Sequence, residues 1–543
     1  MKSHKTILYS LILCSLAFTQ CSKDALKEDP RSIILADNLF RDKAGFEAGL
    51  NGLYDEVRRS RSSVNYGAAG QVMLTPCFIG VDNAYANWRD AYEDVFNNWG
   101  ANNNAAQLPF ELTFRWLYET INAANTIIAR AENPDIDWTE TEKNTVVAEA
   151  RFIRGWCYRH LTYLWGDVPL TLEESSGVTI KTDWERTAVA TVRKAMEDDW
   201  LFAEQHLPET SSNPGKVVKA VAQHYLSELY LVLNRPEDAR DYALKVINNP
   251  IYKLITARYG KKASQPGTPF TDMFIDGNSN KAEGNTEALW VLQNELNVIG
   301  GEGSNIMRRY WVNRYYSLQV GGKNPIMISE ENGGRGIGRW GPTKFALSLY
   351  EPGADDRGSH FAWRLFYRIN TTNPNNIPAG YQLGDTIFID TTSAEKLSNP
   401  NWPNTTKWDY VSPIDVNVDR QYNDQILVRL GETYLLLAEA YLKTSEPQLA
   451  ADAINELRTR AHASPIDAGD VTIDFILDER SRELFSEEER RYTLLRTGKW
   501  LERTRAHNPF AKVSVADRDT LLPIPQAVID ANRTSPMGQN PGY

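Results

Sequence analysis

An internal repeat restricts the fold of this 543-residue chain more than any other feature. The stretch SELYLVLNRPEDARDYALKVI aligns without gaps with AEAYLKTSEPQLAADAINELR, at a constant offset of 211 residues. Each copy has a small residue, an aromatic residue, a loop proline and an alanine that opens a second helix, the pattern of a tetratricopeptide-type hairpin. The matched positions are Ser227, Tyr230, Pro236, Ala239, Ala243 and Val246, and then Ala438, Tyr441, Pro447, Ala450, Ile454 and Leu457. Because small residues let paired helices approach closely, the repeat predicts a mainly α-helical scaffold of such hairpins.

The region between the two copies, from about 251 to 420, differs in character. It is rich in Gly, Asn, Pro and Thr, and short apolar runs such as EALWVLQ and TIFID predict strands or extended loops. Long loops on a regular scaffold often bind ligands. We therefore expect a helical region at 37–250, a loop-rich, aromatic-rich irregular insertion with ligand-facing loops at 251–420, and a second helical region at 421–543. Residues 37–543 are expected to form one structural unit.

The first residues have the features of an export leader followed by a tether. Lys2 and Lys5 precede an apolar stretch at 7–18 that is too short to span a bilayer, which predicts a signal peptide at 1–20. Cys21 follows directly and opens a polar tether that runs to residue 36, as in a bacterial protein lipidated on its first mature residue. Gln20 is unusual immediately before such a cysteine, so cleavage without lipidation stays the alternative.

Charge and motif content argue against several classes of function. The chain has 59 Lys and Arg against 70 Asp and Glu, and its net charge of -11 opposes binding to nucleic-acid phosphates. No HExxH, GxSxG, P-loop or CxxC motif occurs, so the sequence predicts neither an enzyme nor a cofactor. In LDERSRELFSEEERRYTLLR, Asp478 and Arg482, like Glu487 and Arg491, are four residues apart. This spacing predicts a solvent-exposed helix face and not catalytic carboxylates.

One stretch partly matches a calcium-binding loop. Asp276, Asn278, Asn280 and Glu287 fall at its positions one, three, five and twelve. Lys281 stands where the sharp turn of such a loop needs glycine. The sequence therefore predicts no metal site, with these four residues as the calcium alternative.

Aromatic residues gather in VDNAYANWRDAYEDVFNNWG, RRYWVNRYYS and GIGRWGP. Sugar rings present apolar C–H faces edged with hydroxyls, which aromatic rings beside amides and carboxylates match chemically. Core packing of half or more of these residues is the alternative. The residues predicted to contact a ligand are Asp82, Asn83, Tyr85, Trp88, Trp99, Trp311, Tyr315, Tyr316 and Trp340.

Four segments, in consistent order along the chain, resemble the SusD/RagB family of outer-membrane lipoproteins of Bacteroidota. AEARFIRGWCYRHLTYLWGDVPL is similar to the family's helix ending in GDVPL, and ILVRLGETYLLLAEAYL to its second signature. ERSRELFSEEERRYTLLR and the C-terminal LLPIPQAVIDANRTSPMGQNPGY resemble two more. Glu488 and Thr493 depart from the usual glycine and aspartate of the third segment.

The resemblance implies a right-handed stack of tetratricopeptide-like hairpins that supports the irregular half. It also implies a non-catalytic, surface-exposed protein that sits as a lid on a SusC-like TonB-dependent transporter and captures oligosaccharides for import. Cys21 would then anchor the protein to the outer membrane through attached lipid. The signature motifs are scaffold residues, so the resemblance assigns no ligand contacts. A repeat protein that binds peptides or other proteins, and a surface glycoside hydrolase, are the alternatives.

Overall fold

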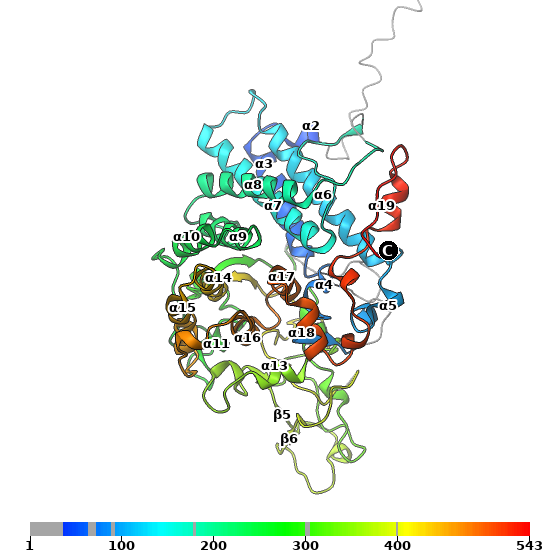
Figure 1. Cartoon of the computed structure of the whole chain (residues 1–543). Helices are drawn as coiled ribbons and strands as arrows, with labels where there is room; N and C mark the ends of the chain where they lie inside the picture. Colours follow the sequence, from blue (N-terminus) through cyan, green and yellow to red (C-terminus); the bar gives the residue numbers. More distant parts are fainter. Residues whose placement is uncertain (1–35, 63–71, 88–92, 178–180, 299–304, 398–399) are drawn as a thin grey trace, which may run out of the picture.

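The computed structural model describes residues 36–62, 72–87, 93–177, 181–298, 305–397 and 400–543. The predicted signal peptide, Cys21 and Trp88 lie outside these ranges. The described chain forms an elongated body with layered helices at one end and irregular loops with the β5–β6 hairpin at the other (Figure 1).

Long helices build the layered end. They are α3 (Lys43–Arg59), α6 (Leu108–Arg130), α7 (Glu140–Trp165) and α8 (Val189–His206), and α7 packs against each of the others. A capping box at Thr139 begins α7 by satisfying backbone donors of its first turn. Gly166 ends the same helix with a positive φ of 73°, a conformation that favours glycine.

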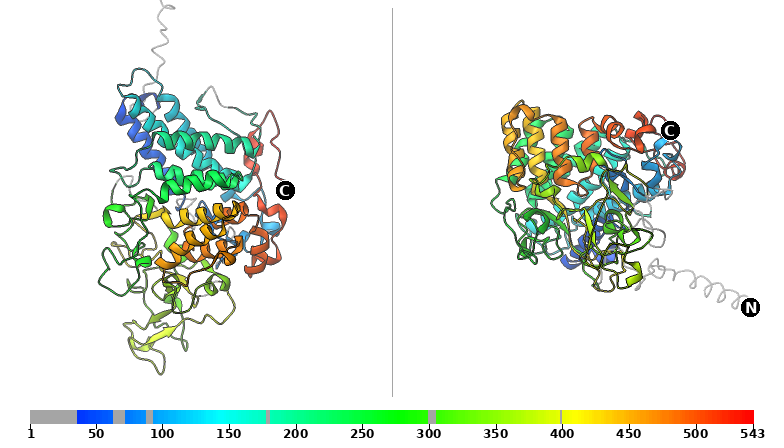
Figure 2. Two further views of the ribbon diagram at one scale, coloured as in Figure 1. Left: turned by 60° about the vertical axis from the view of Figure 1, so that its left-hand side comes forward. Right: turned by 90° about the horizontal axis from the view of Figure 1, so that it is seen from below.

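The repeat forms two helical hairpins, as predicted. The first is α9 (Lys219–Val232) with α10 (Pro236–Ile247), and the second is α14 (Leu430–Lys443) with α15 (Pro447–Arg460). α10 packs against α14, so the two hairpins stack directly although about 200 residues separate them in the sequence (Figure 2). The prediction of a mainly α-helical, tetratricopeptide-like scaffold is therefore confirmed.

The hairpin turns also match between the two copies. Asn234 and Ser445, which the repeat aligns, both have positive φ, at 55° and 63°. The next residue in each copy donates its backbone N–H to the carbonyl of the repeat tyrosine, Tyr230 or Tyr441, at 2.8 Å. The two copies thus close their hairpins with the same turn geometry, although the residues at the turn differ.

Short strands tie the irregular part to both helical regions. Within the described ranges the strands form four antiparallel pairs: β1 (Ala84–Ala86) with β3 (Trp340–Pro342), β2 (Ala288–Leu292) with β8 (Gln425–Arg429), β4 (Trp363–Arg364) with β7 (Asn404–Thr405), and β5 (Phe366–Arg368) with β6 (Thr386–Phe388). β2 and β6 confirm the strands predicted in EALWVLQ and TIFID. β1 and β8 belong to the two flanking helical regions, so their pairing with β3 and β2 connects the insertion to both of these regions.

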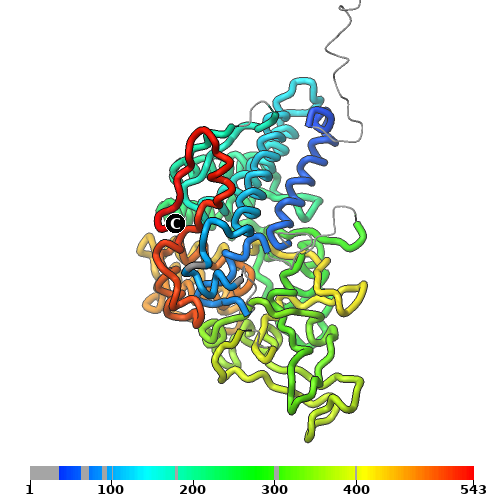
Figure 3. Tube along the Cα trace, turned by 90° about the vertical axis from the view of Figure 1, so that its right-hand side faces the viewer, coloured from blue at the N-terminus to red at the C-terminus, as the bar shows by residue number. Residues whose placement is uncertain are grey.

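Shorter helices complete the fold. They are α2 (Ala36–Leu39), α4 (Thr75–Phe78), α5 (Trp99–Asn102), α11 (Pro269–Asp272), α12 (Met307–Trp311), α13 (Lys344–Ser348), α16 (Ile473–Leu484), α17 (Arg490–Arg496), α18 (Trp500–His507) and α19 (Gln526–Ala531). The C-terminal segment lies against the N-terminal helices (Figure 3), since Leu522 N–H donates to Leu164 C=O at 2.7 Å. No helix of the described residues combines the length and apolar character needed to cross a bilayer.

The acidic segment at 478–491 is packed into the protein, so the predicted solvent-exposed face is wrong. Glu487 is 9% exposed and Arg491 is fully buried. Glu487 pairs with Arg429 at 2.7 Å, and Arg491 donates to a backbone carbonyl, so the two do not pair with each other. Asp478 likewise pairs with Arg503 and not with Arg482. The carboxylates of Glu487 and Asp478 are therefore paired with arginines from other segments, Arg429 and Arg503.

Glu483 lies at the centre of the resulting ion-pair network. Its fully buried carboxylate meets Arg357 at 3.0 Å and also pairs with Arg429 and Arg460. Burial acts to raise the pKa of Glu483, but these three guanidinium groups outweigh burial and hold it well below its usual value. The carboxylate is therefore ionised in the core.

Candidate functional site

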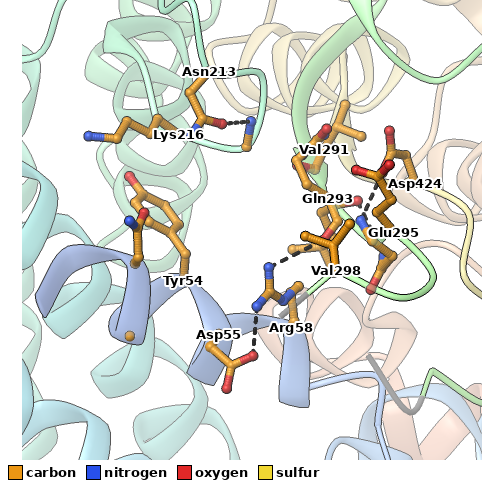
Figure 4. Close-up of a pocket in the computed structure, with 15 residues that line it drawn as sticks. Tyr54, Asp55, Arg58, Asn213, Lys216, Val291, Gln293, Glu295, Val298 and Asp424 are labelled. Carbon is orange, nitrogen blue, oxygen red and sulfur yellow. Dashed lines mark hydrogen bonds and ion pairs between the residues drawn. The ribbon is translucent and has the colours of Figure 1, made fainter. Parts of the chain in front are cut away.

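A polar cleft of about 700 Å³ opens beside α3 (Figure 4). Three segments that are distant in the sequence form its walls: α3, the loop before α9, and the end of β2 with the residue before β8. A cleft of this size can hold a small polar molecule or part of a longer chain.

The first wall is the polar face of α3. Its apolar residues, among them Phe46, Leu50 and Val57, are buried in the core. The residues on the other side of the helix, which include Tyr54 and Arg58, line the cleft. Arg58 donates to Asp55 at 2.7 Å and to the backbone carbonyl of Gln293 at 3.3 Å, which joins α3 to the end of β2.

The second wall, the loop 213–216, is held by polar groups, of which Glu149 is buried. Lys216 donates to Glu47 at 2.8 Å and to Glu149 at 3.4 Å. Tyr54 donates its hydroxyl to Glu149 at 2.7 Å and accepts the backbone N–H of Val217 at 3.0 Å. Burial raises the pKa values of both Tyr54 and Glu149. These contacts fix the loop against α3 and α7.

The third wall continues β2 beyond its last residue. Asp424 accepts the backbone N–H of Asn294 at 2.8 Å and the side-chain amide of Asn280 at 2.7 Å. Gln293 donates its amide to Asn280 at 2.9 Å. Burial raises the pKa of Asp424. The wall therefore presents amides and carboxylates that the protein already orients, groups that can hydrogen-bond the hydroxyls of a ligand.

The aromatic residues predicted to bind a ligand lie in the core instead. Trp99, Trp311, Tyr315 and Trp340 are at most 2% exposed. Trp340 packs edge-on against Trp311 at a centroid distance of 5.2 Å, and Trp99 packs in the same way against Trp500 at 5.5 Å. Their rings fill spaces between segments and have no surface left for a ligand, so the prediction of ligand contacts is wrong for these four. Packing is the alternative that the sequence allowed.

Tyr316 differs from these four because it is half-buried, and the guanidinium of Arg314 lies over its ring at 5.8 Å. It does not line the cleft.

The polar ligand residues predicted beside Tyr85 are buried too. Asp82 is fully buried between Arg490, at 2.7 Å, and Arg503, at 2.8 Å. Burial acts to raise the pKa of Asp82, but these two cations lower it to about 2. Asn83 donates to Ser481 at 3.0 Å, and the buried ring of Tyr85 packs against Phe510. The three residues join the chain near β1 to the C-terminal helices and line no part of the cleft.

Three of the four residues of the calcium alternative have other partners. The Asn278 side-chain oxygen accepts the backbone N–H of Lys261 at 3.0 Å, and that of Asn280 accepts from Gln293. Glu287 is fully buried and pairs with Arg460 at 2.7 Å, whereas Asp276 is exposed. Protein donors thus occupy side-chain oxygens of Asn278, Asn280 and Glu287. Across the described ranges, no group of three or more His, Cys, Asp or Glu residues is arranged to bind a metal.

Sequence reasoning missed all the residues that line the cleft. The polar stripe of α3, at Asn51, Tyr54, Asp55 and Arg58, is visible in the sequence, but it is indistinguishable from an ordinary solvated helix face. The loop 213–216 and Asp424 carry no motif. Only the fold brings these segments together.

Comparison with known proteins gives consistent matches along the chain. The family described as "SusD family" matches residues 274–543, and the family described as "Starch-binding associating with outer membrane" matches residues 62–231. "SusD-like protein P25" of Formosa agariphila is 24% identical over 537 residues, which cover 92% of this chain and 90% of that protein. "SusD-like protein P2" of the same organism is 25% identical over 562 residues and covers 100% of both chains.

Solved structures share the fold. A structure titled "Laminarin binding SusD-like protein" superposes with a TM-score of 0.70 at 19% identity, over 93% of this chain and 100% of that chain. "Surface glycan-binding protein A from Bacteroides thetaiotaomicron in complex with laminarihexaose" has a TM-score of 0.70 at 17% identity, over 92% and 99% of the two chains.

Proposed function

The chain belongs to the SusD/RagB family, and on this premise we propose that it is a surface-exposed, non-catalytic glycan-binding lipoprotein of the outer membrane. In this role it captures oligosaccharides and passes them to a SusC-like TonB-dependent transporter for import. Its described regions act as one structural unit, with the polar cleft as the binding site.

Family membership in both halves of the chain is the observation that carries this proposal. The names of two structural neighbours, which refer to laminarin and laminarihexaose, support a glycan as the ligand class. The cleft offers a suitable surface, because its lining combines the Tyr54 ring with amides, carboxylates and a guanidinium. Such groups hydrogen-bond sugar hydroxyls, and an aromatic ring packs against the C–H face of a sugar.

Isothermal titration calorimetry of the mature protein against a panel of oligosaccharides tests the ligand class. We expect saturable binding of at least one glycan. Tight binding of peptides with no binding of any glycan would refute the proposal and favour peptide uptake.

A matched pair of glycine variants tests whether the cleft is the site. Gly52 lies on the cleft side of α3, and a Cβ atom added there meets no atom of the described residues within 4 Å. Gly52→Leu should therefore fold normally, occupy part of the cleft and weaken glycan binding at least about fivefold. Gly469, which has equally open surroundings but lies outside the cleft, provides the control variant Gly469→Leu. Equal affinity in both variants would place the ligand elsewhere.

The lipid anchor and the transporter need separate tests. Cys21→Ala should release the protein from the membrane and leave glycan binding intact, because each buried acyl methylene contributes about 0.8 kcal/mol to anchoring. Continued membrane association of this variant without the transporter would contradict the anchor. A SusC-like transporter encoded beside the gene is expected to co-purify with the co-expressed protein.

A further inference from the structure

We propose that the cleft selects neutral oligosaccharides and discriminates against glycans that carry carboxylate or sulfate groups. The inference rests on the proposed function and deepens it by naming the ligand class of the same site. It follows from the pairing of the charged groups around the cleft.

Both cations that line the cleft are already neutralised. Arg58 pairs with Asp55 at 2.7 Å and uses a second nitrogen for the carbonyl of Gln293. The ammonium group of Lys216 points away from the centre of the cleft (Figure 4). It lies between two carboxylates, Glu47 at 2.8 Å and Glu149 at 3.4 Å. Burial acts to lower the pKa of Lys216, but these carboxylates outweigh burial and raise it, so the ion pairs persist at neutral pH.

Two lining carboxylates, in contrast, have no cationic partner among the described residues. Asp424 is satisfied by neutral donors, the backbone N–H of Asn294 and the amide of Asn280. Glu295 is exposed and forms no ion pair with any described residue. Three carboxylates and two cations line the cleft. Their immediate partners add the carboxylates of Glu47 and Glu149 and the guanidinium of Arg59, which lies 3.7 Å from Asp55, so five carboxylates accompany three cations. Carboxylates still outnumber cations if buried Glu149 takes up a proton.

The excess of carboxylates over cations determines which sugars can bind favourably in the cleft. Recognition of sulfate or carboxylate groups normally requires an unpaired guanidinium or ammonium, and the cleft provides none in the described part of the chain. An anionic sugar would also approach Asp424 and Glu295 with like charge. A neutral sugar meets no such repulsion, and its hydroxyls can donate to the same carboxylates in charge-assisted hydrogen bonds.

Calorimetry with charge-matched probes tests the inference. The neutral probes are laminarihexaose, maltohexaose and xylohexaose, and the anionic probes are sulfated laminarihexaose and hexagalacturonate. We expect the wild type to bind at least one neutral probe with an affinity independent of salt, and to bind both anionic probes at least about tenfold more weakly. Glu295→Lys adds an unpaired cation at an exposed position and should reduce this preference at least threefold. Glu456→Lys, an exposed substitution on α15 outside the cleft, should not change it.

The results that would refute the charge inference differ from the result that would refute glycan capture. Equal or tighter binding of an anionic probe, with affinity that falls as salt rises, would overturn the charge inference and leave glycan capture intact. An unchanged preference in Glu295→Lys would also overturn it, since the charge of the cleft would then not control selection. Absence of binding to all probes, neutral and anionic, would count against glycan capture itself and remove the basis of the inference.

Discussion

Replacing Glu483 with glutamine tests whether the buried ion-pair network holds the scaffold together. The carboxylate lies on α16 and is fully buried, with Arg357, Arg429 and Arg460 around it. Glutamine has nearly the same shape but no charge, so Glu483→Gln removes the electrostatic interaction without creating a cavity. The three guanidinium groups keep their positive charge in the same buried space.

The expected cost follows from this geometry. Breaking a buried ion pair by removing one partner costs about 3–5 kcal/mol, because the remaining charge is left uncompensated in a region of low dielectric. Glu483 serves three arginines at once, which favours the upper end of this range. Other carboxylates, such as Glu287 beside Arg460 at 2.7 Å, limit the loss. A loss of about 4 kcal/mol would raise the unfolding equilibrium constant by roughly three orders of magnitude.

Chemical denaturation followed by tryptophan fluorescence measures this loss as a change in the free energy of unfolding. Glu502→Gln is the control, because Glu502 is 66% exposed and Lys499 is its only ion-pair partner among the described residues, so its loss should cost less than about 1 kcal/mol. A cost below about 1 kcal/mol for Glu483→Gln as well would refute the reasoning. The network would then contribute no more than a surface ion pair.

Three further predictions concern the core. Three glutamates of the network, Glu479, Glu483 and Glu487, have lowered pKa values in the folded state. Their contribution to stability should therefore be complete above their unfolded-state pKa of 4.5 and disappear as the pH falls through the folded-state pKa values. Thermal denaturation at a series of pH values measures this loss. Trp340→Ala should lower the free energy of unfolding, measured by chemical denaturation, by about 3–5 kcal/mol and leave glycan affinity unchanged. The control Phe388→Ala removes a side chain that is 75% exposed and should cost less than about 0.5 kcal/mol. Gly155→Val should lower the melting temperature, because a Cβ atom at this position would lie 2.6 Å from the Trp200 indole nitrogen.

The hairpin scaffold was predictable from the sequence because its determinants are local. Tyr230 and Tyr441, with the small residues and prolines at matched positions, specify two helices and the turn between them within about twenty residues. The strands β2 and β6 were visible for the same reason, since each is a short apolar run between turn residues.

Burial of charges and of aromatic rings was not predictable, because it depends on segments far away in the sequence. The four-residue spacing of Glu487 and Arg491 is compatible with an exposed pair, and only the fold brings Arg429 to Glu487. The sequence around Trp340 is compatible with a ligand-binding ring, and only the fold packs Trp311 and Tyr310 against it. The cleft was not predictable either, because its walls come from three segments that are distant in the sequence.

The buried network and the cleft share the β2–β8 sheet, which connects the family motifs to the cleft. Glu287, just before β2, pairs with Arg460 of α15, and its backbone carbonyl accepts the N–H of Leu430 at 2.8 Å. Arg429 ends β8 and pairs with Glu483, so the ion pairs hold one end of the sheet against the helices. The other end of the same sheet provides the third wall of the cleft, from the end of β2 and from Asp424. The motif residues Arg429 and Glu483 thus position the cleft without lining it, whereas α3 and the loop 213–216 line it directly.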